Sequence, residues 1–438
     1  MYHRLLSLFD IKGYGLFVVC MGLIGVAFSL SSPYLSLYCT GVIGMSTAAY
    51  GVLMAVNSLS GVFVNSWIAG RTDHGLDRKH IIIISALASA CVYVVYLSLH
   101  NYFLLLVSIG LLAGIGAPAM PQIFASAREA TMKSKSMDST FATSTLRSLF
   151  SLGFLIGPLF GTVILAWAGY PGVFLGTSLL LISTAVLVFF LLKRQKAERV
   201  TFCANPSSDD RDSNLPTSGV ADPGVADPGM KSAARLTRAG GDVPEARMDV
   251  RRPFIAFVLL FIVAFTYNLN TPLFIVHTLH AQPRYVGLVI STSAGLEIPI
   301  MIGLGAIAKR YSNHVLLIYG CVIAMVFYTI LGLTSQLWVL FAIQILQASY
   351  IAIVMGIGLS YFQDILPDAP GVATTLYSNA SSIGVLLGNL SGGAIAQFAG
   401  YRNVYWVSLG IVMVAFVILK SIKQPQPAMV ADVTSQPL

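Results

Sequence analysis

Long apolar segments dominate this sequence and leave few folds open to it. Six of them run at roughly 14–39, 47–69, 80–99, 101–127, 138–167 and 172–192. Six more run at roughly 253–279, 285–308, 314–334, 336–365, 370–398 and 402–422. Each can cross a bilayer as an α-helix, which takes about 20 residues. Because 56% of the residues are hydrophobic and only 10% are charged, a soluble core is excluded. The sequence predicts an all-α membrane protein with twelve transmembrane helices.

A polar stretch separates the two sets of six segments. It is rich in Pro, Asp, Ser, Gly and Arg, and it repeats itself within residues 219–229. Such a composition buries too little apolar surface to fold, which predicts a disordered cytoplasmic linker. The expected domains are a six-helix bundle over 1–193, the linker over 194–251, a second six-helix bundle over 252–423 and a cytoplasmic tail over 424–438.

The positions of Lys and Arg indicate an orientation. Of the 26 such residues, all but Arg147, Arg284 and Arg402 fall on the side that holds both termini, the linker and the turns at 70–79 and 128–137. Since Lys and Arg collect on the cytoplasmic side of membrane proteins, both termini are expected in the cytoplasm. The net charge of +8 follows from this topology and requires no nucleic-acid partner. No cleavable signal peptide is expected, because the first apolar run continues for a full span.

A short charged turn connects the second and third segments. Its charged residues and its first glycine are Gly70, Arg71, Asp73, Asp77, Arg78 and Lys79. One interpretation is a solvated turn whose basic residues hold it in the cytoplasm. That interpretation leaves the two aspartates unexplained, and they favour a conformational latch that docks against neighbouring helix ends.

The two sets of six segments are internal copies of one another. Adding 231 to the numbers of Ser151–Gly161 gives Ser382–Gly392, with the same glycine spacing. The residues of these two stretches that we assign to helix packing are Gly153, Gly157, Pro158, Gly161, Gly384, Gly388 and Gly392. Glycine at every fourth position lets two helices approach closely.

A second internal match concerns the first and seventh segments. Ser29–Pro33 corresponds to Asn268–Pro272 at an offset of 239, and in each a proline follows small polar residues. Polar, Pro-interrupted spans at matching places in two halves indicate a central transport site. We therefore expect two bundles related by rotation about the membrane normal, with spans 1, 4, 7 and 10 lining a midplane cavity.

Twelve spans in two sets of six, with a charged turn after the second, resemble the major facilitator superfamily. The usual turn of that family is Gly-x-x-x-Asp-Arg/Lys-x-Gly-Arg/Lys-Arg/Lys. This chain supplies Asp73, Arg78 and Lys79. It departs from the pattern at His74, where a basic residue is usual, and at the additional acid Asp77.

Several runs are similar, within that superfamily, to the bacterial sugar efflux transporters. These runs are Pro118–Gln122, Ala127–Glu129, Ala294–Pro299, Tyr361–Pro367 and Ala373–Thr375. Residues 153–161 also resemble the Gly-x-x-x-Gly-Pro-x-x-Gly motif of export-type members. The likeness covers nearly all of both halves but not the linker, which is longer than the family usually has. It implies export of lactose, glucose-like sugars and glycosides against a proton gradient, across a bacterial inner membrane.

Two ionisable residues inside the spans are candidates for proton coupling. Glu297 is the only acidic residue near the middle of a span, and Arg147 is the only basic residue well inside one. A charge at mid-bilayer costs about 2.5–3.5 kcal/mol or more, so such residues generally face a cavity and act there. Glu297 is interpreted as a proton carrier, as an acceptor for sugar hydroxyls, or as a structural partner of Arg147.

A sugar site needs amides for hydroxyl groups and an aromatic face for the ring. The candidate substrate-binding residues are Tyr34, Asn57, Gln122, Tyr267, Asn268, Asn270, Gln344, Gln347 and Asn379. Each alone is as well explained by a hydrogen bond between helices. The group as a whole favours a sugar over the alternative, an amphipathic drug.

Other classes of function lack their motifs. The chain has no nucleotide-binding loop, no nucleophile elbow and no His-Glu-x-x-His, so we expect neither an enzyme nor a cofactor. Its five cysteines form no Cys-x-x-Cys pair, so no metal site is expected. The expected partners are a sugar, the proton and the lipid bilayer, and the expected state is a monomer.

Overall fold

The structure is a computed structural model, and it describes residues 14–72, 77–133, 139–191, 250–307, 310–367 and 369–422. The helices of the first half are α2 (Tyr14–Gly41), α3 (Thr47–Thr72), α4 (Arg78–Ser98), α5 (Tyr102–Gly116), α6 (Ala119–Lys133) and α7 (Ser139–Leu191). Those of the second half are α9 (Arg251–Leu273), the π-helical turn η1 (Phe274–Thr278), α10 (Arg284–Ile307), α11 (Asn313–Leu333), α12 (Leu337–Ala342), α13 (Gln344–Ile365), α14 (Pro370–Ala399) and α15 (Tyr401–Lys420). No strand occurs among these residues, which confirms the all-α prediction.

The described chain holds 11 helical segments long and apolar enough to cross a membrane. The predicted fifth and sixth spans form one of them, the 47-residue stretch Thr145–Leu191 of α7. Within α7 the backbone leaves the helical region at Gly169, whose φ is 64° and ψ is −164°. Glycine takes this conformation without a steric penalty, and Pro171 suits the first turn of the helix that follows. The twelve predicted spans are therefore present as 11 helical segments.

Three predicted spans contain breaks, of which the sequence reading anticipated only the one near Pro272. The span at 101–127 is divided into α5 and α6 by a turn at Ala117–Pro118, and the span at 336–365 is divided into α12 and α13. The span at 253–279 ends in η1, which follows Pro272. A proline lacks the N–H that continues the helical ladder, which accounts for the first and third breaks.

The two glycine stripes lie where helices of the same half cross. In the first half, α7 packs on α2. A Cβ on Gly161 would stand 2.6 Å from the carbonyl oxygen of Leu30, and one on Gly153 or Gly157 would collide with Gly25 or Ser29. In the second half, α14 packs on α9: Gly384 meets Phe261, Gly388 meets the carbonyl of Ile262, and Gly392 meets Asn270.

Hydrogen bonds across these crossings repeat as well. The Ser29 hydroxyl donates to the carbonyl of Gly153 at 2.7 Å, and the Thr266 hydroxyl donates to the carbonyl of Gly388 at 3.0 Å. The same short approach and the same type of bond therefore join the first and fifth spans and the seventh and eleventh spans.

A side-chain contact between two helices of the same half also repeats. Arg78 at the start of α4 forms an ion pair with Glu129 of α6, 3.8 Å. Adding 235 to both numbers gives Asn313 and Asp364, whose side chains form a 2.6 Å hydrogen bond between α11 and α13. The internal repeat thus extends to side-chain contacts that the sequence reading did not pair.

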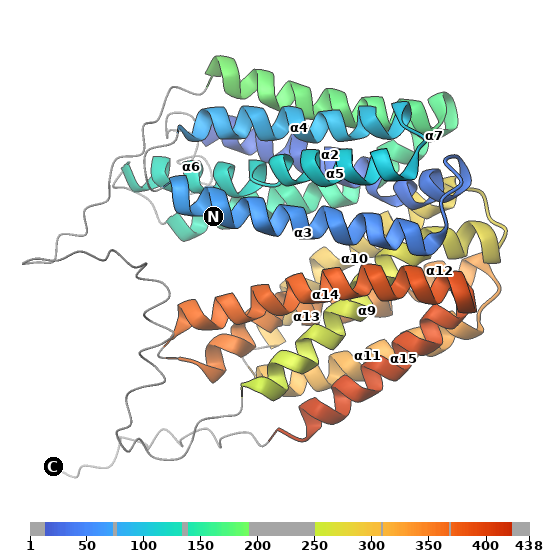
Figure 1. The fold of residues 1–438 in the computed structure, drawn as a ribbon. Coiled ribbons are helices and arrows are strands. Elements are labelled where there is room, and N and C mark those ends of the chain that lie inside the picture. The colour runs from blue at the N-terminus through green and yellow to red at the C-terminus, as the bar shows by residue number, and fades with distance from the viewer. Residues whose placement is uncertain are drawn as a thin grey trace, which may run out of the picture. The chain divides into compact units, whose positions relative to one another are not determined.

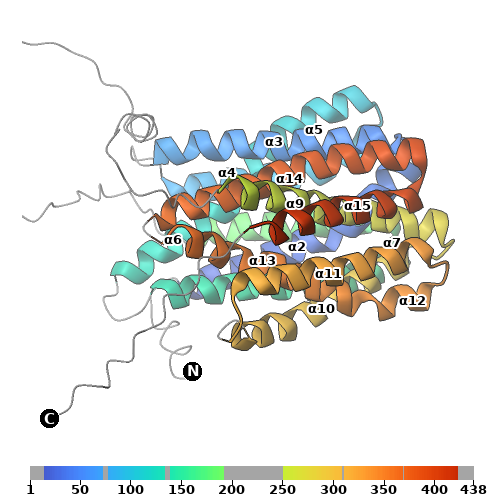
Figure 2. The ribbon, with the colours of Figure 1, turned by 90° about the horizontal axis from the view of Figure 1, so that it is seen from below.

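The two halves form separate groups of helices that belong to one compact unit, residues 1–198 with 250–438. Figures 1 and 2 show the blue-to-green helices α2–α7 beside the yellow-to-red helices α9–α15. We call the end at which α7 ends and α9 begins the linker end, and the opposite end the far end. Residues 192–249 lie outside the described residues, so the predicted domain limits and the disordered linker remain predictions.

Candidate functional site

The two halves contact each other near the far end through small and neutral groups. The Thr47 N–H of α3 donates to Gln397 Oε1 of α14 at 3.0 Å. The Thr162 hydroxyl of α7 donates to the carbonyl of Arg284 at the start of α10, 3.3 Å. These α3–α14 and α7–α10 contacts form the far-end seam.

Glycines allow the backbones of the far-end seam to meet. A Cβ on Gly393 would stand 2.7 Å from the carbonyl oxygen of Thr47, and one on Gly51 would collide with the carbonyl of Asn389. On the other pair of helices, a Cβ on Gly287 would stand 2.5 Å from the carbonyl oxygen of Pro158. Any side chain at these three glycines would therefore push the halves apart.

Tyr34, one of the predicted substrate residues, lies beside this seam. Its side chain is fully buried in α2. Its hydroxyl bonds with Thr162 Oγ1 at 2.8 Å and donates to the carbonyl of Pro158 at 3.2 Å. These hydrogen bonds join α2 to α7, and the Tyr34 hydroxyl lies next to Gly287.

Four predicted substrate residues of the second half are buried between its helices. Tyr267 of α9 donates its hydroxyl to Gln344 Oε1 of α13 at 3.3 Å, and the Gln344 amide donates to the carbonyl of Leu340. The Asn270 amide donates to the carbonyl of Thr266 at 3.0 Å, while its Oδ1 has no partner among the described residues. Gln347 of α13 accepts a hydrogen bond from Ser293 of α10.

Glu297 stands one helical turn after Ser293 on α10 and is half-buried. The helix α10 also contacts α7 of the other half, since a Cβ on Gly295 would stand 3.1 Å from Leu155. The half-buried carboxyl group thus lies on the helix that contacts both α13 and the first bundle.

Arg147 is exposed on α7, and among the described side chains it is not within ion-pairing distance of Glu297. It interacts electrostatically with Tyr377 of α14 in the other half. The Tyr377 hydroxyl donates to the carbonyl of Met355 at 3.3 Å. The remaining candidates on these helices, Asn268 of α9 and Asn379 of α14, are exposed.

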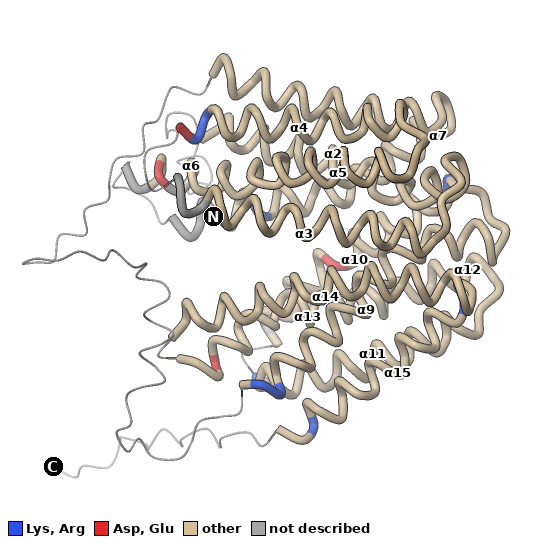
Figure 3. Tube along the Cα trace, viewed as in Figure 1, with Lys and Arg blue, Asp and Glu red and all other residues tan. Residues whose placement is uncertain are grey.

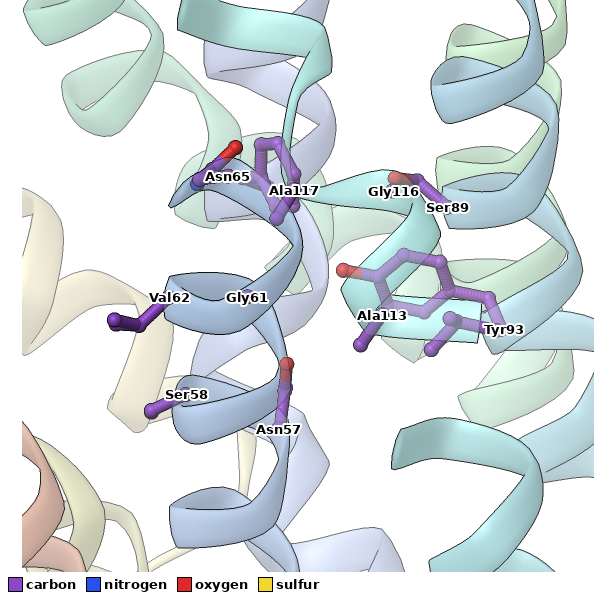
Figure 4. A pocket seen from close by; sticks show the side chains of 12 residues that line it. Asn57, Ser58, Gly61, Val62, Asn65, Ser89, Tyr93, Ala113, Gly116 and Ala117 are labelled. Carbon is purple, nitrogen blue, oxygen red and sulfur yellow. The ribbon is translucent and has the colours of Figure 1, made fainter. Parts of the chain in front are cut away.

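The other two predicted amides belong to the first bundle. Gln122 of α6 is buried, and its Oε1 has no partner among the described residues. Asn57 of α3 lines a cavity of about 340 Å³ that lies between α2, α3, α4 and the α5–α6 break, which Figure 4 shows. The nine substrate candidates therefore do not gather at one point: Asn57 lines a cavity, and several others form hydrogen bonds with neighbouring helices.

The described residues of the charged turn tie helices of the first bundle together. Asp77 caps α4 by accepting from the Lys79 N–H, and its carboxylate contacts His80 at 3.1 Å. The Lys79 ammonium donates to the carbonyl of Phe189 near the end of α7, and Arg78 pairs with Glu129. Gly70 and Arg71 lie in the last turn of α3, and Asp73 lies outside the described residues. The latch remains a prediction.

Most charged residues of the described chain lie near helix ends, as Figure 3 shows. Arg78, Lys79, Arg251 and Lys420 begin or end helices at the linker end. At the far end Arg402 is held within its own bundle, donating to the carbonyl of Gly332 at 2.9 Å. No cluster of three His, Cys, Asp or Glu side chains suited to a metal occurs in the part of the chain that the structure describes.

Comparison with known proteins decides the family. The profile of the Major Facilitator Superfamily matches residues 17–327 and 253–437. Sugar efflux transporter A of Escherichia coli K12 is 31% identical over 414 residues, which is 94% of this chain and 96% of that protein. The chain belongs to the sugar efflux transporter family of the major facilitator superfamily.

Solved structures agree with this assignment at the level of the fold. A mutant of the nucleoside transporter NupG superposes with a TM-score of 0.71 at 15% identity, covering 93% of this chain and all of that one. A bacterial homologue of the lysosomal transporter Spinster, in an inward-facing and unoccupied conformation, gives a TM-score of 0.68 at 14% identity over 93% of this chain and 96% of that one. The major facilitator fold of two six-helix bundles predicted from the sequence is confirmed.

The sequence reading missed several residues that this member of the family places between its halves. Gly51, Gly287 and Gly393 carry no signal in a single sequence, because an apolar face looks the same against lipid and against another helix. Ser293, which bonds Gln347 within the second half, was also missed, although it did carry a signal, since it precedes Glu297 by one turn of a helix.

Proposed function

We propose that this chain exports sugars or glycosides from the cytoplasm, by proton antiport with alternating access. The observation that carries the proposal is the similarity to a sugar efflux transporter across nearly the whole of both chains. Buried and half-buried amides in both bundles support it, because they supply the donors and acceptors that sugar hydroxyls require.

In this proposal both termini lie in the cytoplasm and the far end faces the outside of the inner membrane. The distribution of Lys and Arg supports that orientation. The far-end seam then closes the outer route to the site, and transport requires a second state in which the seam opens and the linker ends approach.

Proton coupling is assigned to Glu297. The chain has no nucleotide-binding motif, so a gradient is the energy source that remains for uphill export. A half-buried carboxyl group on α10, a helix that contacts α7 of the other half, changes its surroundings when the halves move. The protein is proposed to act as a monomer.

The test is transport into everted inner-membrane vesicles that contain the full chain. Labelled lactose and labelled methyl glucoside should accumulate inside when the proton gradient is imposed, and a protonophore should abolish the accumulation. Everted vesicles from cells that lack this protein are the control. Accumulation of ethidium with no accumulation of either sugar would contradict the proposal and support export of amphipathic drugs instead.

A further inference from the structure

A polar cavity is lined entirely by residues of the first bundle. It measures about 340 Å³, and its polar lining includes Asn57 and Asn65 of α3 with Ser89 and Tyr93 of α4. Asn57, Gly61 and Asn65 follow one another at four-residue spacing and so lie along one face of α3. In Figure 4 the Tyr93 hydroxyl points from α4 toward that face.

The amides of this cavity lack protein partners. Within the described residues, the side chains of Asn57, Asn65 and Ser89 make no hydrogen bond. An amide in the hydrocarbon region that has no hydrogen bond costs several kcal/mol. The break between α5 and α6 adds a further acceptor, because Pro121 supplies no N–H to the carbonyl of Ala117, which also lines the cavity. The cavity is therefore built to hold something polar.

Its size and access favour a small solute. The volume lies near the lower limit of small-molecule sites, about 300 Å³, which suits one sugar ring and excludes a drug-sized amphipath. Ser58 and Val62 also line it, and in Figure 4 they project from the side of α3 opposite Tyr93. The cavity thus continues around α3 and is not sealed within the bundle.

We propose that this cavity is a sugar subsite that takes one pyranose-sized ring, distinct from the polar groups of the second bundle. Asn57 and Asn65 bond the hydroxyls of the ring, and Tyr93 supplies an aromatic face and a further hydroxyl. The assignment rests on the proposed sugar export, and it adds Asn65, Ser89 and Tyr93 to the substrate-binding residues.

Equilibrium binding of labelled lactose to the purified full chain tests the subsite. Asn65→Leu removes one amide at nearly the same side-chain size, and we expect binding at least about tenfold weaker than wild type. Tyr93→Phe keeps the ring, and we expect a smaller loss of about threefold. Ser66→Leu is the matched control, because Ser66 is the exposed next residue of α3 and bonds only the carbonyl of Val62. Its binding should equal that of wild type.

The outcomes separate the subsite from the proposed function. Wild-type lactose binding by Asn65→Leu would overturn the subsite, leave a water-filled cavity, and leave sugar export intact. Binding of ethidium but not lactose by the wild type would overturn both. If Asn65→Leu does not purify, Asn65→Cys in native membranes replaces it. Lactose should slow its maleimide labelling at least about fivefold, and unchanged labelling would overturn the subsite.

Discussion

Glu297 combines two properties that no other described acidic residue shares. It lies inside a membrane-spanning helix, and that helix contacts the other half of the protein. Asp77, Glu129 and Asp364 all lie at helix ends and bind partners there. At the scale of single residues, we therefore propose Glu297 as the carboxyl group that couples transport to protons.

Replacing Glu297 by Gln should uncouple transport without abolishing exchange. The amide keeps the size and hydrogen-bonding capacity of the carboxyl group but cannot release a proton. We expect Glu297→Gln to lose accumulation of lactose against a gradient while it still exchanges labelled for unlabelled lactose, measured in everted vesicles. Accumulation at the wild-type level, with the wild-type pH dependence, would return Glu297 to sugar binding or packing.

Arg147 should influence the pH dependence from the opposite half. It is exposed on α7, lies apart from Glu297 in this state and interacts with Tyr377. If movement of the halves brings the guanidinium toward Glu297, its removal changes the proton affinity of the carboxyl group. Because removing a nearby cation raises the pKa of a carboxyl group, we expect Arg147→Gln to shift the pH profile of uphill transport upward by about half a pH unit or more. Arg284→Gln, which removes a far-end charge, is the control; identical profiles for both variants would exclude Arg147 from coupling.

At the scale of helices, each half is built around one close crossing and one tie at the linker end. The crossings join α2 to α7 and α9 to α14, and the ties join α4 to α6 and α11 to α13. Because both are repeated, each bundle is stiffened in the same way. Movement is then expected at the contacts between bundles, where the far-end seam has few hydrogen bonds.

The glycines of the far-end seam should control whether that seam can close. Gly51→Val places a branched side chain against the carbonyl of Asn389, so the halves cannot approach. We expect uphill transport to fall at least about tenfold, and spin labels at positions 42 and 398 to move apart. Gly22→Val is the matched control, because a Cβ at Gly22 meets nothing within 4 Å. Transport by Gly51→Val at the rate of Gly22→Val would contradict the seam's role.

At the scale of the whole molecule, hydropathy predicted the spans and their order, since length and composition alone determine which segments can cross a membrane. It did not predict the breaks at Ala117–Pro118 and after Ala342, because a broken helix keeps the same apolar composition. Whether a polar candidate is buried or exposed was harder still to predict from the sequence. Gln344 and Asn379 look alike in sequence, yet one is buried against Tyr267 and the other is exposed. Only the packing of helices distinguishes them.

The orientation of the molecule can be tested through its linker. A site for a specific protease inserted near residue 220 should be cut in everted vesicles and protected in right-side-out vesicles, because the linker is predicted to be cytoplasmic. Direct contacts such as Thr47–Gln397 join the halves without the linker, so the cut protein should still transport lactose. Cleavage in right-side-out vesicles alone would reverse the proposed orientation.

The neutral character of the far-end seam has a consequence for the conditions under which it holds. The described hydrogen bonds across it join backbone atoms and uncharged side chains, glycines let its backbones meet, and Arg402 bonds within its own bundle. Screening by dissolved ions weakens attractions between charges and leaves such contacts almost untouched. If the far end faces outward, the ionic strength of the external medium can rise from very low to high without weakening the far-end seam. The charged linker end, by contrast, faces a cytoplasm whose ionic strength the cell itself regulates.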